Sequence, residues 1–257
     1  MSRMILAYFF AGGLFVGMVL LLELGWRLGR GRKAKDEEGA RAGLGAVEGA
    51  VFALMGLLVA FTFSGAATRF DARRQLIVQE ANAIGTAWLR LDLLPTAAQP
   101  ELRDFFRRYL DSRLAAYRQI PDMDAVRTEI ARANALQGRI WTQATRACRE
   151  AANPLTAQVI PALNEMFDIA ALHDAVAQIH PPTIIFAMLG VLALMSSLLA
   201  GYAMAGGRSR SWIHVVGFAL ILATTVYVIF DLEFPRLGLV RIDSFDRILL
   251  ELRATMN

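Results

Sequence analysis

Four apolar segments constrain this 257-residue chain more than any other feature of its sequence. A helix that crosses a bilayer needs roughly 20 mostly apolar residues, because each residue rises about 1.5 Å through a hydrocarbon core about 30 Å thick. Four segments fit this length and carry at most one ionisable side chain each: 4–24, 47–67, 183–205 and 212–230. Backbone amides in lipid must bond within their own segment. We therefore predict four transmembrane helices.

The spacing of these segments predicts two transmembrane hairpins with a large helical region between them. The predicted parts are a first hairpin at 1–67, an extramembrane helical region at 68–181, a second hairpin at 182–235 and a C-terminal tail at 236–257. The first apolar segment exceeds the 7–15 residues typical of a signal peptide, so we expect it to be retained as a transmembrane helix.

The region between the hairpins has the pattern of long amphipathic helices, because its apolar residues recur at intervals of three and four. Its prolines predict the breaks. A helix continuous with the second membrane segment should stop at Pro95, and the next should begin near Pro100. A third helix should be capped by Asp124, and a fourth should follow Pro154. No stretch alternates strictly with period two, so the expected fold class is all-α.

Composition argues against a soluble enzyme and against nucleic-acid binding. Hydrophobic residues make up 56% of the chain, compared with about 45–50% in an ordinary soluble domain. The net charge is +4, but the basic residues are interleaved with acidic ones and form no basic stripe. The single cysteine, Cys148, excludes an intrachain disulfide and a cysteine-based zinc site. Catalytic and phosphate-binding motifs are absent from the sequence, so we expect no enzyme activity and no cofactor.

Three ionisable residues fall at one level of the predicted membrane segments: Glu23, Glu48 and His214. Ionisable groups within a span often line a water path or a proton relay. Each of the three also lies within one or two turns of a segment end, where an interfacial charge is the simpler interpretation. Both readings remain open from the sequence.

Two histidines, His173 and His180, lie seven residues apart near Glu165 and Asp168. Such a group could form a metal site, but a solvated helix side near the membrane is the simpler interpretation. We expect no metal here.

The end of the fourth membrane segment carries two acidic residues, Asp231 and Glu233. They suit either a cation-binding or gating cluster, or an acidic boundary of the membrane with a docked tail. Pro235 and Gly238 predict a fixed chain reversal directly after them, and a positive φ at Gly238 would explain the glycine.

Several ordered motifs resemble the bestrophin-like family of bacterial integral membrane proteins. They are Gly-Leu-Leu-Val-Ala-Phe-Thr-Phe at 56–63, Arg-Phe-Asp-Ala-Arg at 69–73, Glu-Ala-Asn-Ala-Ile-Gly at 80–85, and Asp-Leu-Glu-Phe-Pro at 231–235 followed by Gly238. The likeness to true bestrophins, which are pentameric anion channels, is weaker. Their second helices line the pore with apolar residues four apart, and their helical region extends the conduit outside the bilayer.

This resemblance implies a homo-oligomeric channel, pentameric by analogy and most simply for anions, in a bacterial inner membrane. It implies an apolar neck on the second helix at Met55, Val59 and Phe63, with Leu57 and Phe61 as the rival register. It also implies charges at the pore mouth. These would come from Arg69, Asp71 and Arg73.

A non-conducting membrane scaffold or sensor, whose helical region binds a partner, is the competing function. The sequence also leaves the orientation open. The charge of the first hairpin alone favours a cytoplasmic 27–44 connection, whereas the bestrophin resemblance favours the opposite side.

Overall fold

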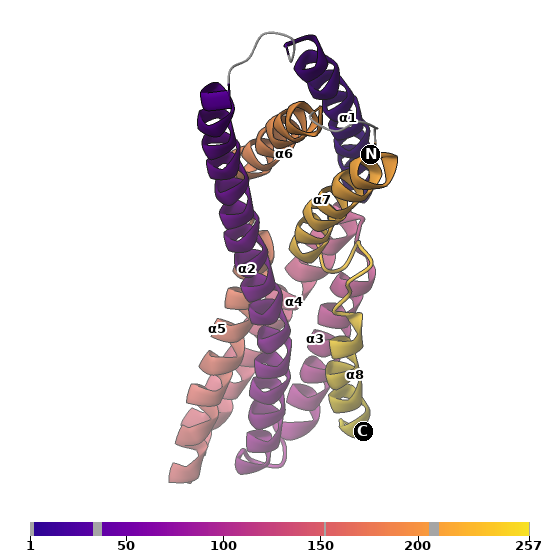
Figure 1. Cartoon of the computed structure of the whole chain (residues 1–257). Helices are drawn as coiled ribbons and strands as arrows, with labels where there is room; N and C mark the ends of the chain where they lie inside the picture. The colour runs from indigo at the N-terminus through magenta and orange to yellow at the C-terminus, as the bar shows by residue number, and fades with distance from the viewer. Residues whose placement is uncertain (1–2, 33–37, 152, 206–210, 257) are drawn as a thin grey trace. The chain divides into compact units, whose positions relative to one another are not determined.

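The computed structural model describes residues 3–32, 38–151, 153–205 and 211–256, and within these ranges it contains helices and no strand (Figure 1). The helices are α1 Arg3–Arg32, α2 Glu38–Arg90, α3 Gln99–Arg118, α4 Met123–Glu150, α5 Val159–Gln178, α6 Thr183–Met204, α7 Trp212–Glu233 and α8 Asp246–Thr255, with short 3-10 helices at Leu91–Leu93, Pro154–Gln158 and Asp243–Phe245. The predicted all-α fold is confirmed.

Four stretches of the described residues are long and apolar enough to cross a bilayer: Ala7–Gly31, Gly45–Leu93, Pro154–Met204 and Trp212–Glu233. Each overlaps one of the four predicted membrane segments. The second segment continues without interruption into the next predicted helix, because α2 is a single helix of 53 residues. No proline occurs within α2 to break it.

The chain forms two compact units. The membrane unit comprises residues 1–69 and 180–234, and the helical unit comprises residues 70–179 and 235–257. In the membrane unit, α1 packs along α6 and α7. Its core is built from residues three or four apart on each helix. Those buried residues are Leu14, Met18 and Leu22 on α1, Ala193 on α6, and Val215, Ala219, Ala223 and Val226 on α7.

Glycines set the close approach of α1 to α6. A Cβ atom added at Gly25 would overlap the Leu198 carbonyl oxygen and lie 2.9 Å from the Tyr202 nitrogen. A Cβ atom added at Gly201 would overlap the Leu22 carbonyl oxygen. The obstacle is backbone in both places, so it cannot rotate away. Small residues at such positions allow membrane helices to gain van der Waals contact along their backbones.

The helical unit has a core that draws on α3, α4, α5, α8 and the later part of α2. Large apolar side chains fill it, including Trp88, Phe106 and Leu163. The prolines act as predicted, with Pro100 in the first turn of α3 and Pro154 at the start of a 3-10 helix.

The predicted cap of α4 is wrong by two residues. Asp122, rather than Asp124, precedes the helix, and its carboxylate accepts hydrogen bonds from the backbone nitrogens of Asp124 and Ala125 at 3.1 Å. An N-cap side chain satisfies amides of the first turn. Asp124 is one of the residues whose amide is satisfied.

The C-terminal tail docks on the helical unit. Arg253 of α8 forms a two-point ion pair with Asp111 of α3, at 2.8 and 3.1 Å, while Leu249 and Met256 are fully buried. The predicted chain reversal is closed by a hydrogen bond from the Ile242 nitrogen to the Pro235 carbonyl oxygen at 3.0 Å. The expected positive φ at Gly238 is wrong, because no described glycine has one.

The glycine contact between α1 and α6 predicts a sharp difference between two alanine variants. Gly25→Ala should lower the free energy of unfolding by about 1–3 kcal/mol, because overpacking forces the two backbones apart. Gly13→Ala on the same helix should be neutral or slightly stabilising, since nothing lies within 4 Å of its added Cβ atom. Thermal unfolding of the purified proteins in detergent measures both. Equal midpoints for the two variants would contradict the close approach.

Candidate functional site

One side of α2 faces its own membrane unit, and the other side is exposed. The Phe52 ring meets the Phe218 ring of α7 edge-on at 6.2 Å, and Met55 and Ala66 are buried. Exposed residues run along another face at helical spacing. They are Ala50, Leu54, Leu57, Phe61 and Ser64.

The exposed face separates the two possible registers of the predicted neck. Met55 is only 7% exposed, whereas Phe63 is 44% exposed and Val59 is half-buried, so these three residues do not share one open face. The rival residues Leu57 and Phe61 are 52% and 67% exposed. Leu57 and Phe61 therefore both lie on the exposed face.

In the helical unit, α2 carries an exposed polar line. Its members are Asp71, Gln75, Gln79, Asn82 and Thr86. All except Asp71 are uncharged amides or hydroxyls. The other side of the helix contributes Ile77 and Ile84 to the core, which is the ordinary pattern of an amphipathic helix.

Arg69, predicted as a mouth charge, is engaged by a buried carboxylate. Its Nε donates a hydrogen bond to Glu233 Oε1 at 2.8 Å, and its Nη2 contacts the same oxygen. Glu233 is 1% exposed. His180 lies on the other side of this carboxylate, with its Nδ1 3.9 Å from Glu233 Oε2. The structure thus joins Arg69 and Glu233, which the sequence analysis assigned to separate features.

Arg73 and Asp71 differ in their surroundings. Arg73 is 4% exposed and donates from Nη2 to the Ile179 carbonyl oxygen at 2.9 Å. Asp71 keeps 60% of its side chain exposed and pairs with Arg74 at 3.0 Å, one helical turn away. Of the three predicted mouth charges, Asp71 is therefore the exposed one.

Asp231, the other acidic boundary residue, is also buried and bonded. The Tyr227 hydroxyl donates to its Oδ1 at 3.2 Å, and the Tyr227 ring stacks on that of Tyr8 with centroids 5.4 Å apart. Burying a carboxylate is costly unless it is paired or hydrogen-bonded. These contacts supply that compensation at the membrane boundary.

The predicted ionisable cluster at the other end of the spans has local partners. Glu23 accepts a hydrogen bond from Arg27, one turn away on α1, at 2.6 Å. His214 Nδ1 lies 2.6 Å from the Ser211 hydroxyl at the start of α7. Glu48 is half-buried on α2. Glu23 and His214 each bond a residue three or four positions away near the end of their own helix, as the interfacial interpretation expects.

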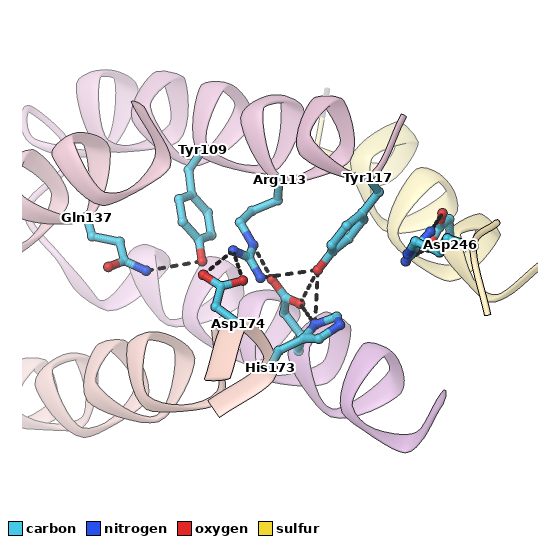
Figure 2. Close-up of polar contacts among 9 residues, drawn as sticks. Tyr109, Arg113, Tyr117, Gln137, His173, Asp174 and Asp246 are labelled. Carbon is cyan, nitrogen blue, oxygen red and sulfur yellow. Dashed lines mark hydrogen bonds and ion pairs between the residues drawn. The ribbon is translucent and has the colours of Figure 1, made fainter. Parts of the chain in front are cut away.

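The helical unit contains a buried polar network that the sequence analysis missed (Figure 2). Glu80 of α2 and Arg113 of α3 lie at its centre, 0% and 1% exposed, with Arg113 Nε donating to Glu80 Oε1 at 2.6 Å. Arg113 Nη1 also donates to both oxygens of Asp174 on α5. The Tyr117 hydroxyl donates to Glu80 Oε2 at 2.8 Å. Three helices are joined through one guanidinium.

His173 completes this network and is buried rather than solvated. It is 5% exposed, and its Nδ1 lies 2.6 Å from Glu80 Oε2 and 3.0 Å from the Tyr117 hydroxyl. No group of three metal-binding side chains occurs among the described residues. Residues 80 and 173 are far apart in sequence, and only their helical faces hinted at burial.

Burial and neighbouring charges together set the pKa values of Glu80 and Tyr117 in this network. Burial alone would raise the pKa of Glu80, but the charge of Arg113 and the hydrogen bond from His173 lower it to about 2. Burial raises the pKa of Tyr117, and the nearby Glu80 carboxylate raises it further. At neutral pH Glu80 is therefore ionised and Tyr117 carries its proton, as their hydrogen bond requires.

Two further contacts extend the network. Gln137 of α4 donates to the Tyr109 hydroxyl at 3.3 Å. Arg236 lies over the Tyr117 ring at 4.4 Å and forms a two-point ion pair with Asp246 at 2.7 and 2.9 Å. The network thereby connects the core helices to the C-terminal tail.

Comparisons with known proteins agree with the resemblance seen in the sequence. A family model described as the bestrophin-like domain matches residues 13–244. A variant of a bacterial bestrophin homologue from Klebsiella pneumoniae superposes with a TM-score of 0.64 at 15% identity, covering 93% of this chain and 98% of that chain. A membrane-protein variant gives 0.67 at 13% identity, with 94% and 96% covered. These structures show a shared fold. A search of curated proteins found no match.

Glu80 should be essential to the stability of the helical unit. Glu80→Gln leaves Arg113 with only the partly exposed Asp174 as its counter-ion, and breaking a buried ion pair costs about 3–5 kcal/mol. Glu101→Gln, at an exposed position on α3, should have little effect. Because the folded pKa of Glu80 lies below the ordinary 4.5, its contribution is fully present above pH 4.5 and is lost as the pH falls toward 2.

Denaturant unfolding across this pH range tests both statements. The difference in the free energy of unfolding between the parent and Glu80→Gln should narrow as the pH falls. A difference that is small at neutral pH, or that grows in acid, would contradict the role assigned to this carboxylate.

Proposed function

Because the chain belongs to the bestrophin-like family, we propose that several copies of this membrane protein surround an ion path lined by their α2 helices. The observation that carries the proposal is the exposed face of α2 at Leu54, Leu57 and Phe61. A single chain contributes one such helix, so an enclosed path needs further copies. A pentamer is the arrangement implied by true bestrophins.

The apolar part of this face is suited to a gate. Rings of Leu57 and Phe61 from several copies would offer water no hydrogen-bond partner along the path. Narrow apolar constrictions exclude water and ions by dewetting. Ser64, seven residues after Leu57 on the same face, would then begin the polar side of the constriction.

Anion selectivity, which the resemblance implies, needs a cation facing the path. Arg69 was the expected source, but it is bonded to the buried Glu233. The proposal therefore covers ion conduction, and the geometry does not favour Arg69 as a chloride-selecting ring. A non-conducting scaffold is the alternative and predicts no flux.

We also propose a multi-pass topology in which the α4 region and the C-terminal tail lie on the same side of the bilayer. The native Cys148 is a poor reporter, because it is half-buried and burial raises the pKa of its thiol. Single cysteines at Lys33, Ala135 and Arg247 in a Cys148→Ser background should serve better, since Ala135 and Arg247 are exposed.

A membrane-impermeant maleimide, applied to intact and to permeabilised cells, tests this topology. Cysteines at Ala135 and Arg247 should be labelled under the same condition, either in intact cells or only after permeabilisation. The cysteine at Lys33 should show the opposite labelling pattern. Opposite responses at Ala135 and Arg247 would rule out an even number of spans between them.

Conduction predicts that shrinking the neck raises ion flux. Leu57→Ala combined with Phe61→Ala should raise flux several-fold in liposomes, because wider rings admit water. Val59→Ala combined with Phe63→Ala tests the other register and should have the smaller effect. Equal protein incorporation must be shown for each sample. Flux at the level of empty liposomes for every variant would replace the channel with the scaffold.

A further inference from the structure

We infer that Asp71 forms an acidic ring in the proposed ion path and makes that path prefer cations. The inference rests on the proposed channel and concerns which ions it admits. It starts from the charges near the end of the apolar face of α2, where the sequence places Arg69, Asp71, Arg73 and Arg74. Three of these four are basic, so composition alone favours anions.

The contacts of the side chains reverse that expectation. Arg69 is held by Glu233, which is 1% exposed, and Arg73 is itself 4% exposed and bonded to the Ile179 carbonyl oxygen. A guanidinium held against a buried carboxylate has most of its field cancelled at short range. The charge of Arg69 is thus cancelled by Glu233, and Arg73 is buried away from the exposed face, so neither presents an isolated positive charge there.

Arg74 also has contacts that fix its position. Its guanidinium lies over the Phe245 ring at 4.4 Å and near the Phe70 ring at 5.7 Å. It pairs with Asp71 at 3.0 Å, but the aspartate keeps 60% of its side chain exposed against 39% for the arginine. An exposed pair of this kind is weak. The carboxylate is thus the more accessible of the two charges.

Asp71 lies on the face that the proposed path would use. Leu57, Ser64 and Asp71 follow one another at seven-residue intervals and are all exposed, and such residues share one side of a helix. The exposed positions that continue from Asp71 are Gln75, Gln79, Asn82 and Thr86. Amides and hydroxyls both donate and accept hydrogen bonds, so they favour neither sign of ion.

Symmetry multiplies this single charge. Each additional copy would add one carboxylate at the same level of the path, and their fields would sum wherever they lie within about 8 Å, the screening length at physiological salt. Rings of Asp or Glu select cations in channels. Asp71 is therefore the residue of this chain that would set the sign of the permeant ion.

Reversal potentials under a potassium chloride gradient in planar bilayers test the inference. The parent should pass potassium in preference to chloride. Asp71→Asn should lower the potassium-to-chloride permeability ratio several-fold, and Asp71→Lys should move it past unity toward chloride. Asp104→Asn is the matched control, because Asp104 is also exposed and pairs with an arginine one turn away on its own helix, α3. It should leave the ratio unchanged.

The possible failures are distinct. A parent that conducts but prefers chloride, or a ratio that ignores both Asp71 substitutions, overturns the acidic ring and leaves the channel standing. A parent that passes neither ion overturns the channel and the ring together. Gel-filtration elution of each variant at the parent's position shows that altered assembly is not the cause of a changed ratio.

Discussion

The continuity of α2 is the constraint on which the rest of the structure depends. This one helix runs for 53 residues and takes part in both compact units. Lipid requires every backbone amide of its apolar part to bond within the helix, and the absence of proline lets the same pattern continue beyond that part. Its side chains therefore occupy a fixed rotational order, with Met55 and Ala66 turned inward and Leu57 and Phe61 turned outward. The proposed path follows from that order.

Buried charges are compensated by specific partners in both units. Glu233 is met by Arg69 in the membrane unit, and Glu80 is met by Arg113 and His173 in the helical unit. Desolvation makes an unpaired buried carboxylate costly, so the arginines that satisfy these groups are committed to structure. The arginines of the motif at 69–73 therefore cannot be counted as free positive charges. An arginine-rich sequence can leave an aspartate as its most exposed charge.

Sequence reasoning succeeded where the determinant is local. The apolar segments and the prolines predicted the helices and their breaks, because both act through neighbouring residues. It failed where distant residues meet: His173 pairs with Glu80 across 93 positions, and neither helix carries a motif that reveals it. The neck on the second helix stays a prediction, since a span that is apolar all round gives no signal for the face that would line a path. The α4 cap was misplaced from Asp122 to Asp124 because both are capping residues in an exposed turn.

Cysteine substitution at Ser64 tests the central claim most directly, namely that the exposed face of α2 lines an ion path. In a Cys148→Ser background, a positively charged thiol reagent should reduce the flux of Ser64→Cys and leave the background unchanged. Leu220→Cys, at an exposed position of α7, provides the matched control and should be insensitive. Complete modification of Ser64→Cys, verified by mass spectrometry, with undiminished flux would contradict the account.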